Sequence, residues 1–168
     1  MASAAGTVEP MTFLEQFQAI GLVAVAMLLG GLVGLERDRA GHAAGIRTNM
    51  LVAGAAALVV VLGSAALEAS DTTTGDPSRA LHAVITGIGF LGGGMILRDG
   101  TGGRTSGLTS AASVFIVAAV GASAGMGEVV LAVGVTALAL VTLGGVKALQ
   151  QRAPKLTGDE HDDPEVAG

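Results

Sequence analysis

Five apolar stretches run along this 168-residue chain, and its basic residues are sorted almost entirely to one side of them. The stretches are 18 or 19 residues long and contain no Asp, Glu, Lys or Arg. At about 1.5 Å per residue, each nearly crosses a hydrocarbon core about 30 Å thick. We therefore predict an all-α membrane protein with five spans, at Phe17–Leu35, Asn49–Leu67, Ala80–Leu97, Leu108–Gly125 and Val129–Val146.

The segments between these spans alternate across the bilayer, and their basic charge is unequal. One set of segments holds eight basic residues, namely Arg37, Arg39, Arg47, Arg98, Arg104, Lys147, Arg152 and Lys155. The other set, which includes the N-terminus, holds only Arg79. Short loops rich in Lys and Arg stay in the cytoplasm. We therefore predict that the N-terminus lies outside and the C-terminus inside, and that a homodimer would be parallel.

Composition excludes several kinds of chemistry. The chain has no Cys, and its three His residues fall on separate segments, so we expect no disulfide, no thiolate metal site and no His cluster. No nucleophile and base can be assembled from these loops, so we expect no enzyme. The acidic outer segments argue against a nucleic-acid partner.

The length allows one folded domain. We divide the chain into an outer arm at 1–16, a transmembrane domain at 17–150 and a cytoplasmic tail at 151–168. The tail contains two prolines and five acidic residues, a composition typical of disorder. Within the domain, Asp76 and Pro77 form a helix-start signal for the third span.

Glycine is the most abundant packing signal, with 27 residues. Gly30–Gly34, Gly89–Gly93 and Gly121–Gly125 are GxxxG pairs inside spans, a pattern that lets transmembrane helices approach closely. We therefore expect a seam between the first, third and fourth spans.

The third span also contains a second pattern, because Gly87, Gly89 and Gly92 have the spacing of a dinucleotide-binding fingerprint. That fingerprint needs a preceding strand, which an apolar span does not offer, so we reject it.

The consecutive glycines Gly92, Gly93 and Gly94 are unusual, because they disfavour a helix by roughly 3 kcal/mol against alanine. Two interpretations compete. One is a very close helix crossing, which we favour because it is the commoner use of small residues. The other is a broken helix whose carbonyls line a polar pathway, as in transporters.

The predicted inner face carries a charged cluster. Glu36 follows the first span, at the negative end of its dipole, and Asp99 follows the third. These two carboxylates could hold Mg²⁺, although local pairing with Arg37, Arg39, Arg47 or Arg98 is favoured because metal sites usually need more oxygen ligands. Arg47, Thr48 and Asn49 open the second span, where a helix N-terminus and an arginine suit an anion such as a lipid phosphate. Pairing of Arg47 with Glu36 is equally open.

Three runs of sequence resemble the signatures of the MgtC/SapB family of bacterial membrane proteins. They are GGLVGLERDRAGHAAGIRTNMLVAGAAAL at 30–58, ITGIGFLGGGMILRDG at 85–100 and GLTSAASVFIVAAVGASAG at 107–125. The resemblance covers about residues 17–146. Residues on the family's matching positions are Glu36, Arg37, 44–49, the glycines of the third span, Arg98 and 107–109. Ser106 stands where the family usually has Arg, and the soluble ACT-like domain of longer members is not expected here.

The resemblance implies a multi-pass protein of the bacterial inner membrane, tied to growth under magnesium limitation and, in pathogens, to survival inside host cells. It also implies binding to other membrane proteins, including the proton-translocating ATP synthase. Two functions follow as hypotheses. The first is a non-enzymatic protein of magnesium homeostasis that acts in the bilayer by contacts through its glycine seams or its inner face, including contacts within homo-oligomers. The second is a small channel or transporter for a cation such as Mg²⁺, with a pathway near Gly92–Gly94 and a cytoplasmic carboxylate mouth at Glu36 and Asp99.

Overall fold

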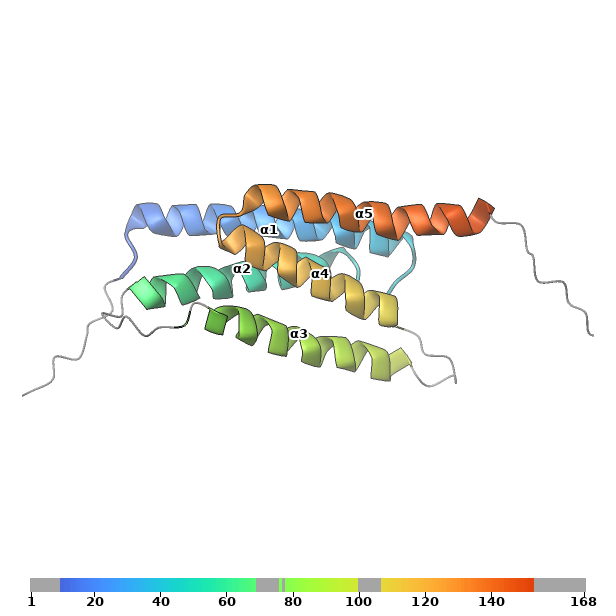
Figure 1. Ribbon diagram of the computed structural model, residues 1–168, viewed down its shortest axis with the longest axis horizontal. Coiled ribbons are helices and arrows are strands. Elements are labelled where there is room, and N and C mark those ends of the chain that lie inside the picture. The colour runs from blue at the N-terminus through green and yellow to red at the C-terminus, as the bar shows by residue number, and fades with distance from the viewer. Residues whose placement is uncertain (1–9, 69–75, 77, 100–106, 153–168) are drawn as a thin grey trace, which may run out of the picture.

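The computed structural model describes residues 10–68, 76, 78–99 and 107–152, and the side chains within these ranges except those of 97–99 and 146–152. This part of the chain is helical and contains no strand. Its five helices are α1 (Phe13–Arg39), α2 (Ile46–Glu68), α3 (Ser78–Asp99), α4 (Leu108–Gly125) and α5 (Val129–Arg152) (Figure 1).

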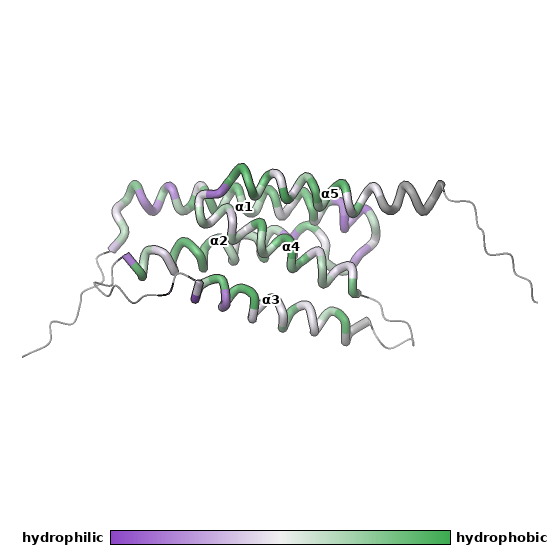
Figure 2. Tube along the Cα trace, viewed as in Figure 1, coloured by the Kyte–Doolittle hydropathy of each residue, from purple (hydrophilic) through white to green (hydrophobic). Residues whose placement is uncertain are grey.

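The helices form an elongated bundle in which α1, α3 and α5 run one way and α2 and α4 run the other (Figure 1). Helix α2 contacts α1, α3 and α4, whereas α3 lies at one edge against α2 and α4. Helices α1 to α4 are long and apolar enough to cross a membrane, and α5 is apolar over Val129–Gly145. Figure 2 shows hydrophilic residues gathered mainly at the helix ends. The prediction of an all-α membrane protein is confirmed.

Helix α1 begins at Phe13, four residues before the predicted span and inside the predicted outer arm. The reason is a capping box. The Glu15 amide donates to Thr12 Oγ1 at 3.4 Å, and the Thr12 amide donates to Glu15 Oε2 at 2.7 Å. These two bonds satisfy amides that a helix start leaves without partners. The rest of the arm at 1–9, and the tail from 153, lie outside the described residues.

Two reversals of the chain depend on glycines with positive φ. Gly41 follows α1 at φ 74°, and its amide donates to Asp38 O while the His42 amide donates to Arg37 O, both at 3.0 Å. Gly127 follows α4 at φ 83°, and its amide donates to Ala124 O while the Glu128 amide donates to Ser123 O, both at 3.0 Å. Both turns are Schellman motifs, which satisfy the last carbonyls of a helix and need a residue in the left-handed region.

The predicted start signal of α3 is also observed. The Ser78 amide donates to Asp76 Oδ1 at 2.9 Å, and the Arg79 amide donates to Asp76 O at 3.2 Å. Asp76 therefore caps the helix, as N-cap aspartates do. Pro77 lies outside the described residues.

The core consists mainly of alanine and valine, and it follows the faces where α1 and α4 cross α2. A Cβ added at Gly30 would lie 2.6 Å from Asn49 O, and one added at Gly34 would lie 2.7 Å from Ile46 Cα. On the other side of α2, a Cβ at Gly125 would lie 2.5 Å from Ala57 O. The GxxxG pairs of α1 and α4 thus both allow backbone approach to α2.

The expected seam through the third span is wrong within one chain. A Cβ at Gly87, Gly89, Gly93 or Gly94 would meet no atom within 4 Å, and one at Gly92 would meet only Ala111 Cβ at 3.7 Å. The backbone of α3 is helical through all three consecutive glycines, so the broken-helix interpretation is also wrong. The seam instead joins α1, α2 and α4, because the glycines of α1 and α4 pack closely against small alanines of α2.

Candidate functional site

Buried polar side chains gather where α1 ends and where α2 and α4 begin. Arg37 is 3% exposed, Asn49 is 0%, and Ser110 and Ser113 are 4% and 2%. This is the end of the bundle predicted to face the cytoplasm. The Ser113 hydroxyl donates to Ser110 O at 2.8 Å, so its hydrogen-bonding capacity is directed into its own helix.

Arg37 is the most deeply buried charge among the described residues, and Glu36 is its ion-pair partner. Both Nε and Nη2 of Arg37 contact Glu36 Oε2. Arg37 shares the core-facing side of α1 with Val33 and Gly30, which are four and seven residues earlier. The Glu36 side chain is 22% exposed. The guanidinium compensates a carboxylate that would otherwise lie unfavourably at a helix C-terminus.

Asn49 ties the preceding loop to the first turn of α2. Its Nδ2 donates to Ala44 O at 2.8 Å and to Gly45 O at 2.9 Å, which also fixes the orientation of the amide. Its Oδ1 is buried without a hydrogen-bond partner, and so is Nδ1 of His42. Buried polar atoms are normally paired with protein or ordered water. Sequence reasoning selected Asn49 but missed His42, whose position just after Gly41, the glycine that follows the C-cap of α1, was the available signal.

The predicted inner-face residues at the start of α2, apart from Asn49, lie outside this cluster. Arg47 and Thr48 are exposed on the first turn of α2, and Arg47 forms no ion pair with the described residues. Arg98 and Asp99 lie in the last turn of α3, but their side chains are outside the described set. No group of three or more His, Asp or Glu side chains suited to a metal occurs among the described residues. Binding of Mg²⁺ by Glu36 and Asp99 therefore stays a prediction, in which Arg37 competes for Glu36.

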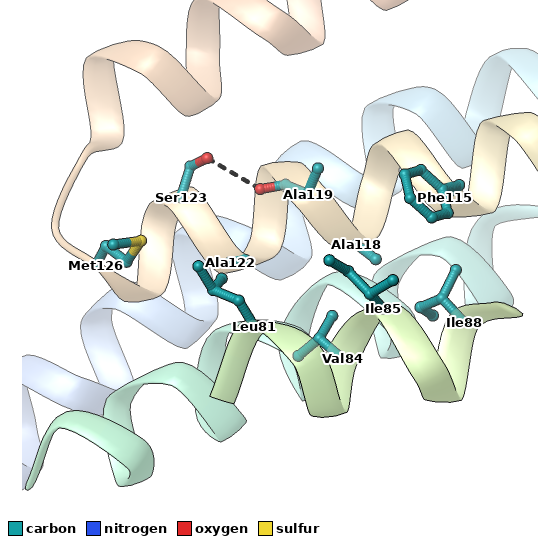
Figure 3. Close-up of a pocket in the computed structure, with 10 residues that line it drawn as sticks. All are labelled: Leu81, Val84, Ile85, Ile88, Phe115, Ala118, Ala119, Ala122, Ser123 and Met126. Carbon is teal, nitrogen blue, oxygen red and sulfur yellow. Dashed lines mark hydrogen bonds between the residues drawn. The ribbon is translucent and has the colours of Figure 1, made fainter. Parts of the chain in front are cut away.

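Two apolar grooves flank α3. The first has a volume of about 290 Å³ and separates Leu81, Val84, Ile85 and Ile88 of α3 from α4 (Figure 3). The Ser123 hydroxyl on its α4 wall donates to Ala119 O at 2.9 Å, within its own helix (Figure 3). The second groove, about 360 Å³, lies between α3 and α2. Both grooves suit hydrocarbon rather than a polar ligand.

The side of α3 that carries Phe90 is uncovered, and Gly87 at its border also lines the second groove. Only 6% of its most apolar 18-residue window is buried, against 56% for α4. Phe90 is 83% exposed, and Gly87, Gly93 and Gly94 lie three or four residues from it on the same side. We call these four residues, together with Thr86 and Gly89, the open face of α3. Helix α3 also has the lowest mean hydropathy of the four helices that are long enough to span a membrane.

Comparison with known proteins identifies a matching family and several relatives. The model of the MgtC family matches residues 23–152. Protein SrpB of Synechococcus elongatus is 42% identical over 152 residues, which cover 84% of this chain and 83% of SrpB. Protein MgtC of Salmonella typhimurium is 39% identical over 115 residues, or 68% of this chain. Protein MgtC of Brucella abortus is 45% identical over 105 residues, or 62% of this chain.

The similarity reaches different extents in these relatives. It spans 46% of the Salmonella MgtC protein and 41% of the Brucella protein, so less than half of either is represented here. No solved structure matches the chain. The matched segment contains the end of α1, all of α2, α3 and α4, and α5, and therefore both the buried polar cluster and the open face of α3.

Proposed function

This chain belongs to the MgtC family, and from that premise we propose that it is a multi-pass protein of the bacterial inner membrane that serves magnesium homeostasis. We propose further that it acts without catalysis, through contacts between its helices and other membrane proteins. The magnesium role comes from the relatives named MgtC. Contacts as the means of action come from the geometry of α3.

The open face of α3 carries this proposal. A helix that faces lipid gains by being strongly apolar, whereas helix–helix contacts in membranes favour small residues. Helix α3 is the least apolar of the four long helices and also the least buried. The glycines of its open face expose backbone with no protein atom within 4 Å of an added Cβ. This combination supports a surface that another transmembrane helix covers. The family resemblance makes the proton-translocating ATP synthase one candidate partner.

The transport alternative needed backbone carbonyls freed by a break at Gly92–Gly94. Because α3 is a continuous helix there, its carbonyls are engaged in helical hydrogen bonds. This observation favours contacts over a glycine-lined pathway. Transport remains the outcome that the following experiment can reveal.

The test combines growth with flux. A bacterial strain that lacks its own copy is grown in limiting magnesium while it expresses the natural chain, Gly93→Leu or Gly134→Leu. Gly134 lies on α5, and a Cβ there also meets nothing within 4 Å, which makes it the matched control. We expect Gly93→Leu to lose support of growth and Gly134→Leu to keep it. Magnesium flux into proteoliposomes of the pure natural chain would overturn the proposal and establish transport.

A further inference from the structure

Building on the proposed role of α3 as a contact face, we propose that its occupant is the α3 of a second copy of this chain, in a parallel two-fold dimer. The proposal names the partner of that face, and three properties of the described residues lead to it.

The first property is that the open face of α3 carries both a protrusion and hollows. Phe90 projects with 83% of its surface exposed. Gly87 lies three residues before it, and Gly93 and Gly94 lie three and four residues after it, so all four share one side of the helix. A Cβ at any of these glycines would meet nothing within 4 Å. One face therefore offers a ring and the shallow surface that can receive a ring.

The second property is orientation. A two-fold interface uses the same patch on both subunits, so the patch must be complementary to itself. The basic residues are divided eight to one between the two predicted sides of the membrane, which favours a single orientation for every copy. Two copies of α3 therefore meet in parallel and at equal depth. Each Phe90 can then lie over the Gly93 and Gly94 of its partner, while Gly89 and Gly93 supply the GxxxG spacing of close parallel pairs.

The third property is that no other described helix of the same chain packs against the open face of α3. The described contacts of α3 are with α2 and α4, and Ile88 is its only buried residue among those whose side chains are described. The grooves on either side of α3 are apolar and narrow. Their volumes of about 290 and 360 Å³ are far below that of a helix about 10 Å across. A helical partner therefore fits the open face rather than either groove.

The experiment uses the full chain in bacterial membranes, with the photoreactive residue benzoylphenylalanine replacing Phe90. The control carries the same residue in place of Leu28, which is 66% exposed near the middle of α1. Two differently tagged copies are expressed together and illuminated. We expect a product of twice the chain's mass that carries both tags, formed from the Phe90 position and absent from the Leu28 position.

The outcomes separate this inference from the proposed function. A Phe90 adduct with a different membrane protein would overturn the second copy as occupant while leaving the proposed contact function in place. Adducts with lipid alone, as at Leu28, would overturn both. Adding Gly93→Leu should abolish the doubled product, whereas adding Gly134→Leu should not. If the doubled product survives Gly93→Leu, the glycine hollow is not the contact and the inference fails.

A second readout does not depend on the large substitution at Gly93. Because the chain contains no Cys, Thr86→Cys introduces a single thiol on the open face of α3. Under a membrane-permeant oxidant it should form a disulfide-linked dimer, and Leu28→Cys should not. A monomeric Thr86→Cys variant that remains folded and correctly inserted would contradict the two-fold pairing.

Discussion

Gly30→Ala tests whether the crossing of α1 and α2 depends on the absence of a single methyl group. The added Cβ would lie 2.6 Å from Asn49 O and 2.7 Å from Ala53 Cβ, whereas ordinary contact begins at 3.4 Å. Both obstacles belong to the buried part of α2, and the oxygen is backbone, so neither can rotate away. The helices must separate by about 0.8 Å, the shortfall from 3.4 Å, if the alanine is to be accommodated.

The expected loss follows from that separation. A gap of about 0.5–1 Å removes a quarter to a half of each atom–atom attraction of roughly 0.1–0.2 kcal/mol. Over some tens of atom pairs along a crossing this amounts to about 1–3 kcal/mol, which is also the usual penalty for overpacking a core. Alanine returns up to about 1 kcal/mol through its higher helix propensity. We expect Gly30→Ala to destabilise the fold by about 1–2 kcal/mol net.

The measurement is reversible unfolding in bicelles, followed by circular dichroism against denaturant. Gly134→Ala is the matched control, because a Cβ there meets nothing within 4 Å. That variant should be neutral or more stable by up to about 1 kcal/mol. The two substitutions are chemically identical, so only the surroundings can separate them. If Gly30→Ala were as stable as Gly134→Ala, the tight α1–α2 crossing would be refuted.

Three further predictions concern orientation, the ion pair and a helix cap. A reporter active only in the cytoplasm should work when fused after Gly168 and be silent when fused before Met1; the opposite pattern would reverse the predicted orientation, and equal activity at both ends would contradict five crossings. Glu36→Gln should destabilise the protein toward the low end of roughly 3–5 kcal/mol, because it leaves the buried charge of Arg37 uncompensated, and adding Arg37→Gln should restore part of this loss in thermal unfolding. The same melts should be indifferent to millimolar Mg²⁺; a shift that Glu36→Gln abolishes would instead support a cation site. Hydrogen bonds from the side chain and the backbone amide of Ser78, the first residue of α3, hold the pKa of Asp76 below its usual value. Its stabilisation of that helix is therefore full above the ordinary value of about 3.9 and lost as the pH falls below it. Amide-exchange protection at the start of α3 should show this loss, and Asp76→Asn should remove it.

Much of the helical architecture could be predicted, because membrane spans are determined by local properties. Length, apolarity and the exclusion of charge are properties of consecutive residues, and the described helices contain the predicted spans. The boundaries differ where side chains cap the backbone. The capping box of Thr12 and Glu15 starts α1 four residues before the predicted span, and Asp76 sets the start of α3. Only the second of these signals was used in the sequence analysis.

The pairing of helices could not be predicted in the same way. Gly30–Gly34 and Gly89–Gly93 have identical spacing, yet one pair packs against α2 and the other meets no atom of the chain. What distinguishes them lies on the partner. Residues of α2 such as Ala53 are small enough to receive glycines from both α1 and α4, and this complementarity joins residues far apart in sequence.

The inner-face cluster shows the same limit for charged residues. The sequence placed Glu36 near four arginines and could not choose among them. Burial decided the pairing, because Arg37 lies on the core-facing side of α1 while Arg47 is exposed. The buried, unpaired atoms of Asn49 and His42 depend on how the loop between α1 and α2 folds. The Schellman turn directs that loop, and which atoms it buries is apparent only in the three-dimensional structure.

The position of α3 follows from how the other helices use their surfaces. Because α1 packs on one side of α2 and α4 on another, the alanine-rich surface of α2 is buried inside the bundle. Helix α3 therefore packs along only one narrow side. That side needs only a few branched apolar residues such as Val84 and Ile88, so the glycines of the open face make no contact within the monomer that a side chain would disturb. Glycine in a helix that gains nothing from it is unfavourable by about 1 kcal/mol per residue. Four open glycines on one helix therefore favour an offsetting contact beyond the chain, which the proposed parallel pairing of two α3 helices would supply.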